Sequence, residues 1–392
     1  MRIFFSLVLL LLCTATARAA PMEIIIAYLG QVRDRPPALS NLDTPPADEG
    51  LAGALLGIDD NNTTGRFTNQ HYTLAPVTLA VADDPTEAVT AFQKAGRNFI
   101  IADLIAAKLE TALQAPGAEG LLFFNVAAPD IHLREARCRA NLLHTLPSRV
   151  MLADALMQYL VRKRWTRLFL IEGPRPEDVL YAAALRRAAM KFGAKIVSEK
   201  KWTGDHDARR TAQAEMPLFT QDAKDHHVIL VADEIGDFGD FILFRSWAPR
   251  PVAGTQGLVP TPWHRVIEQW GAAQLQSRFV KKFGRPMTAR DYAAWLAVRS
   301  VGEAATRTAE ADPAALTAFI KSAEFALAAF KGRKLSYRPW NGQLRQPIPL
   351  VTARSLVSQS PQEGFLHPLS EMDTLGIDRP ESRCALAKGG PK

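Results

Sequence analysis

The stretch IIIAYL at residues 24–29 is a short apolar run of the kind that forms a buried strand. Similar runs follow it, and helix-like segments separate them. The strand-like runs are Tyr72–Ala80, Phe99–Ala102 and Leu121–Val126, and the helix-like segments are Asp48–Asn61, Pro85–Ala95 and Asp103–Leu113. Strands separated by helices of about 10–15 residues indicate βαβ units and a parallel sheet. We expect the first helix to end at Asn61, because the Asn and Gly residues between 61 and 65 readily adopt left-handed conformations.

The alternation starts again after Pro147. Its helix-like segments are Arg149–Arg162, Glu177–Phe192 and Asp207–Glu215, and its strand-like runs are Arg167–Glu172, Lys195–Trp202 and His227–Ala232. The two series join near residues 143–149. The sequence therefore predicts an α/β protein with two similar doubly wound, Rossmann-like lobes.

The second half of the chain has a different pattern. Helices are expected at Pro262–Phe283, Ala289–Ala309 and Pro313–Lys321. Asn341-Gly342 lies between the extended runs Lys334–Trp340 and Gln343–Val351. This dipeptide predicts a hairpin, because both of its turn positions need a positive φ.

The N-terminal segment has the pattern of a secretory signal peptide. Arg2 precedes an apolar run from Ile3 to Leu12, and Ala17-Arg18-Ala19 provides small residues at the cleavage site. The run is shorter than the ~20 residues that a transmembrane helix needs. We expect residues 1–19 to be removed and the mature chain to be exported to the periplasm.

Length and charge restrict the class of protein further. The 392 residues exceed the size at which one hydrophobic core stops growing, about 250–300 residues, so two lobes are expected. The net charge is +7, and its Lys and Arg residues are spread along the chain instead of forming a basic tail. This distribution argues against a nucleic-acid partner and is compatible with a small anionic ligand.

Two cysteines remain beyond the signal segment, Cys138 and Cys384. An oxidising compartment allows them to form a disulfide that ties the C-terminal tail to the middle of the chain. The alternative, a reactive thiol or a metal pair, would need neighbouring ligands at metal spacing, and the sequence has none. The sequence also lacks a Gly-x-Ser-x-Gly elbow, a phosphate-binding glycine-rich loop and a His-Glu-x-x-His helix. We therefore predict a protein that is not an enzyme and carries no metal or resident cofactor.

Several stretches together resemble the type I periplasmic binding proteins, the leucine/isoleucine/valine-binding relatives that serve ABC transporters. The resemblance begins with Ile24–Leu29, Leu39-Ser40, Gly50–Ala54, Asp60-Asn61 and Thr64-Gly65. Longer stretches are similar to the substrate-binding subfamily that is associated with pyrroloquinoline-quinone-dependent alcohol oxidation systems. These stretches are Asp48–Arg66, Asn125–Trp165, Pro249–His264, Gly284–Ala294, Phe330–Gln346 and Asp373–Cys384.

The resemblance implies two lobes with a three-crossing hinge and a ligand between them. We expect the crossings near Pro147, near Val259–Thr261 and within Leu335–Arg345. Lobe 1 would then comprise residues 20–146 and 262–334, lobe 2 residues 147–261 and 335–358, and a C-terminal tail residues 359–392. Hinge bending would close the lobes around the ligand.

Ligands of open parallel sheets lie beyond the carboxyl ends of the strands. This rule nominates residues that follow the predicted strands or lie at a crossing: Arg33, Arg35, Asp103, Asn125, Arg175, Trp202, Thr255-Gln256 and Trp263. Amino-acid-binding relatives place Ser or Thr after the third and fourth strands to hold an α-carboxylate. This chain has Asp103 and Asn125 there, which argues against an amino-acid ligand.

A planar quinone with three carboxylates would stack on aromatic rings and accept hydrogen bonds from arginine guanidiniums. Trp263 lies at a crossing, and Trp295 lies on a helix that contributes an aromatic residue to the site in relatives. The arginine candidates are Arg33, Arg35, Arg175 and Arg290. The alternatives are core or hinge packing for the tryptophans and a solvated surface position for each arginine.

Together these features give one main hypothesis and two alternatives. The main hypothesis is a monomeric periplasmic solute-binding protein of an ABC importer linked to quinone-dependent alcohol oxidation. Its ligand would be pyrroloquinoline quinone or a small alcohol-derived compound, and its partner an inner-membrane permease. The alternatives are a sensory ligand-binding protein that regulates alcohol oxidation, and a branched-chain amino acid or amide-binding protein.

Overall fold

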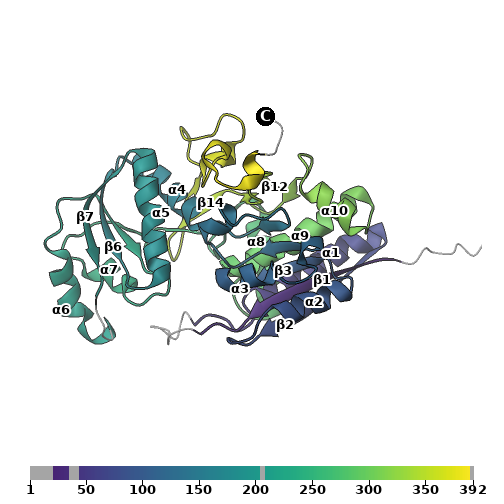
Figure 1. Cartoon of the computed structure of the whole chain (residues 1–392). Coiled ribbons are helices and arrows are strands. Elements are labelled where there is room, and N and C mark those ends of the chain that lie inside the picture. Colours follow the sequence, from purple (N-terminus) through teal and green to yellow (C-terminus); the bar gives the residue numbers. More distant parts are fainter. Residues whose placement is uncertain (1–20, 35–43, 204–207, 389–392) are drawn as a thin grey trace, which may run out of the picture.

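The computed structural model describes residues 21–34, 44–203 and 208–388. The expected signal segment, residues 1–19, lies outside these ranges, and so does Arg35. The chain forms two α/β lobes, each with its own parallel sheet, and the C-terminal segment lies over their junction (Figure 1). The prediction of two doubly wound lobes is confirmed.

Lobe 1 contains a 5-stranded parallel sheet with the order β2-β1-β3-β4-β5. Its elements are β1 (Met22–Gln31), α1 (Leu51–Thr68), β2 (Gln70–Leu79), α2 (Thr86–Lys94), β3 (Phe99–Asp103), α3 (Ala106–Ala112), β4 (Leu122–Asn125), β5 (Leu142–His144), α8 (Ala272–Phe283), α9 (Ala289–Thr308) and α10 (Pro313–Ile320). Successive side chains of β1 point to opposite faces of the sheet. Ile26 and Tyr28 join the core under α1 and α9, whereas Ala27 and Leu29 join the core under α2 and α3. Helices therefore cover both faces, as a parallel sheet requires.

Lobe 2 repeats this architecture around a 4-stranded sheet with the order β7-β6-β8-β9. Its elements are α4 (Arg149–Arg162), β6 (Arg167–Glu172), α5 (Pro176–Phe192), β7 (Lys195–Lys201), α6 (Ala208–Thr220), β8 (Val228–Ala232), α7 (Gly239–Arg245) and β9 (Val252–Gly254). Leu168 and Leu170 pack against α4 and α5, and Phe169 and Ile171 face α6 and α7. The strand β9 is at the edge of this sheet.

Two further short sheets lie at the junction. One has the order β10-β14-β15, from β10 (Val259–Pro260), β14 (Ile348–Val351) and β15 (Leu356–Ser360). The other contains β11 (Leu327–Ala328), β12 (Lys334–Tyr337) and β13 (Leu344–Arg345). The strands β10 and β14 pair with each other at this junction.

The segment expected to hold the third passage, Leu335–Arg345, and the strand β14 that follows it divide their side chains between the two cores. Leu335, Tyr337, Leu344 and Val351 belong to the hydrophobic core of lobe 1. Ile348 and Leu350 are the first side chains of this segment in the core of lobe 2. The hairpin around Asn341-Gly342 forms, with Tyr337 paired to Leu344, so both of its strands remain with lobe 1.

Two predicted helix boundaries are wrong by seven residues or more. The first helix does not end at Asn61 but continues to Thr68, because the Asn61 amide donates to the carbonyl of Val298 in α9 and is buried there. The helix predicted from Pro262 begins only at Ala272. Trp270 and Gly271 adopt positive φ angles of 56° and 81°, which an α-helix does not accommodate.

The C-terminal tail is attached to both lobes. On lobe 2, the Asp154 carboxylate of α4 accepts from the backbone N–H of Gly376 at 2.9 Å. On lobe 1, Cys384 forms a disulfide with Cys138, and Glu135 accepts from the backbone N–H of Arg383 at 2.9 Å. The tail therefore crosses the junction as an additional covalent connection.

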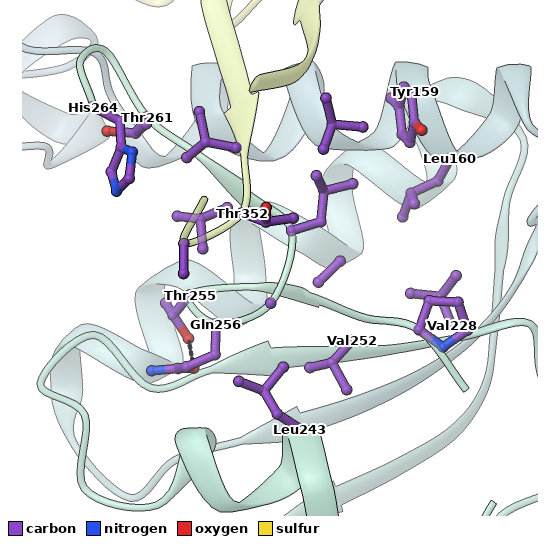
Figure 2. Close-up of a pocket in the computed structure, with 18 of the residues that line it drawn as sticks. Tyr159, Leu160, Val228, Leu243, Val252, Thr255, Gln256, Thr261, His264 and Thr352 are labelled. Carbon is purple, nitrogen blue, oxygen red and sulfur yellow. Dashed lines mark hydrogen bonds between the residues drawn. The ribbon is translucent and has the colours of Figure 1, made fainter. Parts of the chain in front are cut away.

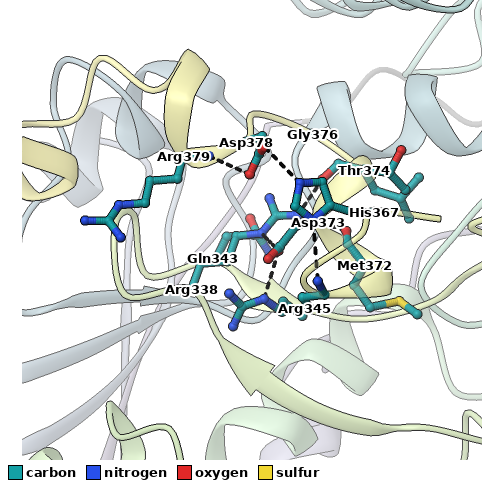
Figure 3. Close-up of polar contacts among 12 residues, drawn as sticks. Arg338, Gln343, Arg345, His367, Met372, Asp373, Thr374, Gly376, Asp378 and Arg379 are labelled. Atoms are coloured by element: carbon teal, nitrogen blue, oxygen red, sulfur yellow. Dashed lines mark hydrogen bonds and ion pairs between the residues drawn. The ribbon is translucent and has the colours of Figure 1, made fainter. Parts of the chain in front are cut away.

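A buried ionic network joins this tail to the β12–β13 hairpin (Figure 3). The Asp373 carboxylate accepts from Nε of Arg338 and from Nε of Arg345, each at 2.8 Å. Arg338 also donates to the carbonyls of Met372 and Leu375. Burial of Arg338 lowers its pKa despite the neighbouring carboxylate, and the several acceptors compensate for its lost hydration.

Candidate ligand-binding site

A cluster of five polar side chains lies where β1 and β3 of lobe 1 end: Tyr28, Arg33, Glu49, Asp103 and Arg290. Asp103 is at its centre. Its carboxylate accepts from the Tyr28 hydroxyl at 2.7 Å and from Nη2 of Arg33 at 2.8 Å. Arg290 pairs with Glu49 at 2.9 Å and approaches Asp103 at 3.7 Å. Burial, together with the adjacent Asp103 carboxylate, raises the pKa of Tyr28, so its hydroxyl stays protonated and donates.

Two helix starts bring Glu49 and Arg290 to this cluster. Thr288 and Asp291 form a capping box at the start of α9, which fixes the turn that carries Arg290. The same Asp291 carboxylate accepts from the backbone N–H of Gly50 at 2.8 Å, just before α1. The carboxylate of Asp291 therefore holds the starts of α1 and α9 together beside the ends of β1 and β3.

Lobe 2 contributes a second group of charges at its own strand ends. Arg149, at the first turn of α4, donates through Nε and Nη2 to both carboxylate oxygens of Glu234, at 2.7 Å each. Glu234 follows β8. Nη1 of Arg149 also donates to Asp130, which follows β4 of lobe 1, at 3.1 Å. One guanidinium thus bridges the strand-end loops of the two sheets, so the carboxyl ends of both sheets converge on the same region.

Burial changes the acidity of this second group. Desolvation raises the pKa of Glu234, and its bidentate pair with Arg149 opposes that rise. Asp178, in the first turn of α5, accepts from the backbone N–H groups of Glu234 and Arg175. Desolvation is the larger effect there and raises the pKa of Asp178 to about 6.

Arg175 and Asp237 form a further pair at the edge of the lobe 2 group, at 2.5 Å and with both side chains about one-third exposed. The loop that carries Asp237 is held by Asp233, whose carboxylate accepts from four consecutive backbone N–H groups, residues 236–239. A rigid backbone thus presents Asp237 and Glu234 at the end of β8.

The structure brings together some of the residues predicted from sequence. Arg33, Asp103 and Arg290 meet in the lobe 1 cluster, and Arg175 lies beside the lobe 2 group. Asn125 instead organises its own loop. Its side-chain oxygen accepts from the backbone N–H groups of Ala127 and Ala128, and its side-chain amide nitrogen contacts Nδ1 of His144. Arg35 lies outside the described residues.

The three predicted tryptophans belong to hydrophobic cores and not to the strand-end clusters. Trp263 stacks on Tyr292 with ring centroids 4.6 Å apart, and its indole N–H donates to Gln276. The Trp295 indole donates to Asp60 at 2.9 Å. Trp202 stacks on Phe238 with centroids 5.2 Å apart. Each ring is more than nine-tenths buried by the protein itself.

The sequence pattern did not nominate five polar members of the two clusters: Tyr28, Glu49, Asp130, Arg149 and Glu234. Glu234 had a usable signal, because it follows a predicted strand by two residues and the strand-end rule applies to it. Tyr28 lies inside the first predicted strand, where the apolar pattern indicates a core residue. Glu49 and Arg149 precede or begin helices, and only the packing of those helices places them at the strand ends.

Comparisons with known proteins agree with this architecture. No family model and no curated protein matches the sequence. Among solved structures, a branched-chain amino acid ABC transporter periplasmic ligand-binding protein from Burkholderia xenovorans is 16% identical with a TM-score of 0.71, covering 93% of this chain and 100% of that one. A leucine-, isoleucine-, valine-, threonine- and alanine-binding protein from Brucella ovis is 15% identical with a TM-score of 0.63, covering 88% of this chain and 93% of that one.

A third similar structure is an ABC transporter solute-binding protein from R. palustris in complex with benzoate. It is 12% identical with a TM-score of 0.63, and the match covers 93% of this chain and 99% of that one. The chain therefore has the two-lobed fold of the type I periplasmic binding proteins. No helix among residues 21–34, 44–203 and 208–388 has the length and apolarity to cross a membrane.

Proposed function

We propose that this chain is an exported periplasmic solute-binding protein that delivers a small molecule to the permease of an ABC importer. The observation that supports this proposal best is the Arg149 bridge, which joins strand-end loops of lobe 1 and lobe 2 through Asp130 and Glu234. A ligand at this place would contact both lobes at once. Binding would then stabilise a closed arrangement through contacts made only when both lobes are engaged.

The ligand that we propose is pyrroloquinoline quinone or a small alcohol-derived compound, as the sequence resemblance implies. Arg33 and Arg290 are the two guanidiniums of the lobe 1 cluster, and both are mostly buried beside carboxylates. A tricarboxylate ligand would offer these guanidiniums bidentate partners in exchange for Asp103 and Glu49. Stacking on Trp202, Trp263 or Trp295 is not part of the proposal, because internal contacts occupy those rings.

A branched-chain amino acid is the second candidate ligand. Carboxylates outnumber guanidiniums at the strand ends near lobe 2, where Asp130, Glu234 and Asp237 share Arg149 and Arg175. An excess of negative charge suits a ligand ammonium group. Two of the similar structures are binding proteins for branched-chain amino acids, which agrees with this alternative.

The test is a calorimetric titration of the mature chain with pyrroloquinoline quinone and, separately, with L-leucine. Arg290→Gln should weaken binding of the quinone roughly tenfold or more, since a charged hydrogen bond contributes about 1.5–3 kcal/mol. Arg307→Gln is the matched control, because Arg307 lies on the same helix, is 65% exposed and pairs with Glu303 one turn earlier. Small-angle scattering should show a smaller radius of gyration with ligand.

The outcomes distinguish a wrong choice of ligand from a wrong function. Binding of L-leucine and not of the quinone would replace the ligand and keep the solute-binding function. If neither compound binds, native mass spectrometry of protein freshly isolated from its compartment would show any small molecule that accompanies it. A chain that carries none and does not become more compact with either compound would contradict the proposed function.

A further inference from the structure

A pocket of about 720 Å³ lies beside the edge strand β9 of lobe 2, apart from the two charged clusters (Figure 2). Such a volume falls in the range of small-molecule sites, about 300–1,000 Å³. Its walls come from the end of α4, from β9, from α7 and from the strands β10, β14 and β15 at the junction. Thr255 and Gln256, which the strand-end rule nominated, line it, whereas no residue of the two charged clusters does.

The two ends of this pocket differ in polarity. At one end lie Leu160 and Val228, both fully buried, with Tyr159 beside them. Toward the other end lie Thr255, Gln256, Thr261 and His264, as Figure 2 shows. Aliphatic side chains such as Val252, Leu258 and Val351 line the space between them. The pocket is therefore amphipathic along its length.

Most polar atoms at the polar end of the pocket already have partners inside the protein. The Thr255 hydroxyl accepts from the backbone N–H of Asp233 at 2.9 Å, and the Gln256 amide donates to the Asp233 carbonyl at 3.0 Å. The Thr261 hydroxyl donates to the carbonyl of Trp263 at 2.9 Å. These contacts hold the wall in place and leave His264 as the side chain suited to a ligand.

His264 has the geometry of a neutral donor. The backbone N–H of Val266 approaches Nδ1 at 3.4 Å, which favours the tautomer with its proton on Nε2. Burial, together with the adjacent Arg265, lowers the pKa of His264 and keeps the ring uncharged at neutral pH. The lining residues include no Lys or Arg, and Asp240 is their one acid. An anionic ligand would find no counter-charge in this lining.

We propose that this pocket binds a neutral amphiphile: an apolar chain or ring that lies against Val228, Leu160 and Val252, with one acceptor oxygen bound by Nε2–H of His264. A hydroxyl, aldehyde, ketone or ester oxygen would serve as the acceptor. The inference goes beyond the proposed function and does not depend on it, because the pocket is lined by lobe 2 and the junction strands and its occupancy is measured directly.

The experiment uses the mature chain and the fluorescence of the apolar probe 1-N-phenylnaphthylamine. Straight-chain alcohols from butanol to decanol should displace the probe, with affinity rising roughly three- to fourfold per methylene group as apolar area is buried. Octanoate should displace it much less well than octanol at neutral pH. Equal displacement by octanoate and octanol would overturn the proposed chemistry.

Variants connect the probe to this pocket. Leu243→Trp, which fills the pocket from α7, should weaken probe binding roughly tenfold or more. Phe244→Trp is the matched control, since Phe244 is the next residue of the same helix, is 86% exposed and does not line the pocket. Val357→Arg is a second blocking variant. This rim position is 41% exposed, so the substitution disturbs folding less than one in the core. Loss of binding in Phe244→Trp but not in the blocking variants would refute the site.

The role of His264 has a separate readout. His264→Phe keeps a ring of similar size and removes the donor. It should weaken displacement by octanol severalfold and leave the direct binding of 1-N-phenylnaphthylamine unchanged, because that probe has no oxygen acceptor. An unchanged affinity for octanol would remove His264 from the proposal.

Discussion

Asp103 shows how one carboxylate organises a site at the scale of single residues. Gly50 approaches it so closely that a Cβ at this position would lie 2.3 Å from Oδ2 of Asp103, and Gly50 has a φ of +86°. Both facts require glycine: the φ lies outside the range of most L-residues, and the space is already occupied. The cluster of Tyr28, Arg33 and Arg290 around Asp103 depends on that close approach.

We predict that Gly50→Ala lowers the free energy of unfolding by about 2 kcal/mol or more, from backbone strain and steric overlap together. Gly193→Ala is the matched control, because Gly193 also has a positive φ, of +77°, but open space around its Cβ position. Its loss should be smaller, about 1–2 kcal/mol, because only the backbone conformation is strained there. Urea denaturation of the three proteins measures both values, and equal losses would contradict the close approach at Asp103.

Asp178 gives the protein a dependence on pH. Its pKa of about 6 in the folded protein exceeds the ~3.9 of an unfolded aspartate, so the folded state holds the proton more tightly. The contribution of this group to stability is therefore present at low pH and is lost as the pH rises from about 4 to about 6. The ionised group above pH 6 carries a desolvation cost.

We predict that the stability of the wild type relative to Asp178→Asn increases as the pH is lowered from 7 to 4, by at most about 3 kcal/mol. The asparagine variant removes this titration while other groups titrate alike in both proteins. Urea midpoints measured across that range test the sign. A difference that is constant with pH would contradict the raised pKa.

At the scale of secondary-structure elements, the contact between α1 and α9 positions the lobe 1 cluster. These helices lie close together because glycines face the partner helix. A Cβ on Gly53 would lie 1.9 Å from the carbonyl oxygen of Asp291, and one on Gly302 would lie 2.1 Å from the Asn61 side chain. The Asn61 amide closes the contact by donating to Val298.

We expect Gly53→Ala to push α9 away from α1, and with it Arg290 from Asp103. The overlap should lower the free energy of unfolding by about 1–3 kcal/mol. Gly120→Ala is the control, because nothing lies within 4 Å of its Cβ position and its φ is not in the left-handed range. Chemical denaturation measures the stability of each variant. A Gly53→Ala protein as stable as the control would show that the helices have room to separate.

At the scale of the whole molecule, the C-terminal tail joins both lobes. It is held to α4 of lobe 2 through Asp154 and Gly376, and to lobe 1 through Asp373 and the Cys138–Cys384 disulfide. The two cysteines are 246 residues apart in sequence. A link that closes so long a loop restricts the unfolded chain strongly.

We predict that Cys384→Ser lowers the free energy of unfolding by about 2–5 kcal/mol. A reductant should lower the melting temperature of the wild type toward that of the variant and leave the variant itself unchanged. Hydrogen exchange should be faster in the variant at residues 371–388, where the tail loses its second attachment. A wild-type melting temperature that does not respond to the reductant would contradict the stabilising role of the bridge.

The local sequence pattern was sufficient for the two-lobed α/β fold and for most element positions. Apolar runs such as Ile24–Leu29 and Arg167–Glu172 predict the strands, because a buried parallel strand must be apolar on both faces. The strand-end rule also located Arg33, Asp103 and Arg175, since parallel strands place their carboxyl ends at one edge. The predicted end of α1 and the predicted start of α8 were wrong. Contacts with α9 determine the first of these boundaries, and positive φ angles determine the second.

Other features depended on the tertiary structure alone. Periodicity cannot tell whether a tryptophan faces a ligand or a neighbouring ring, so Trp202, Trp263 and Trp295 required coordinates to be placed in the cores. The Arg149 bridge joins Asp130 and Glu234, which are 104 residues apart in the printed sequence and meet only when both lobes have folded. Charged contacts of this kind depend on three-dimensional distance, whereas the pattern that folds each lobe is local along the chain.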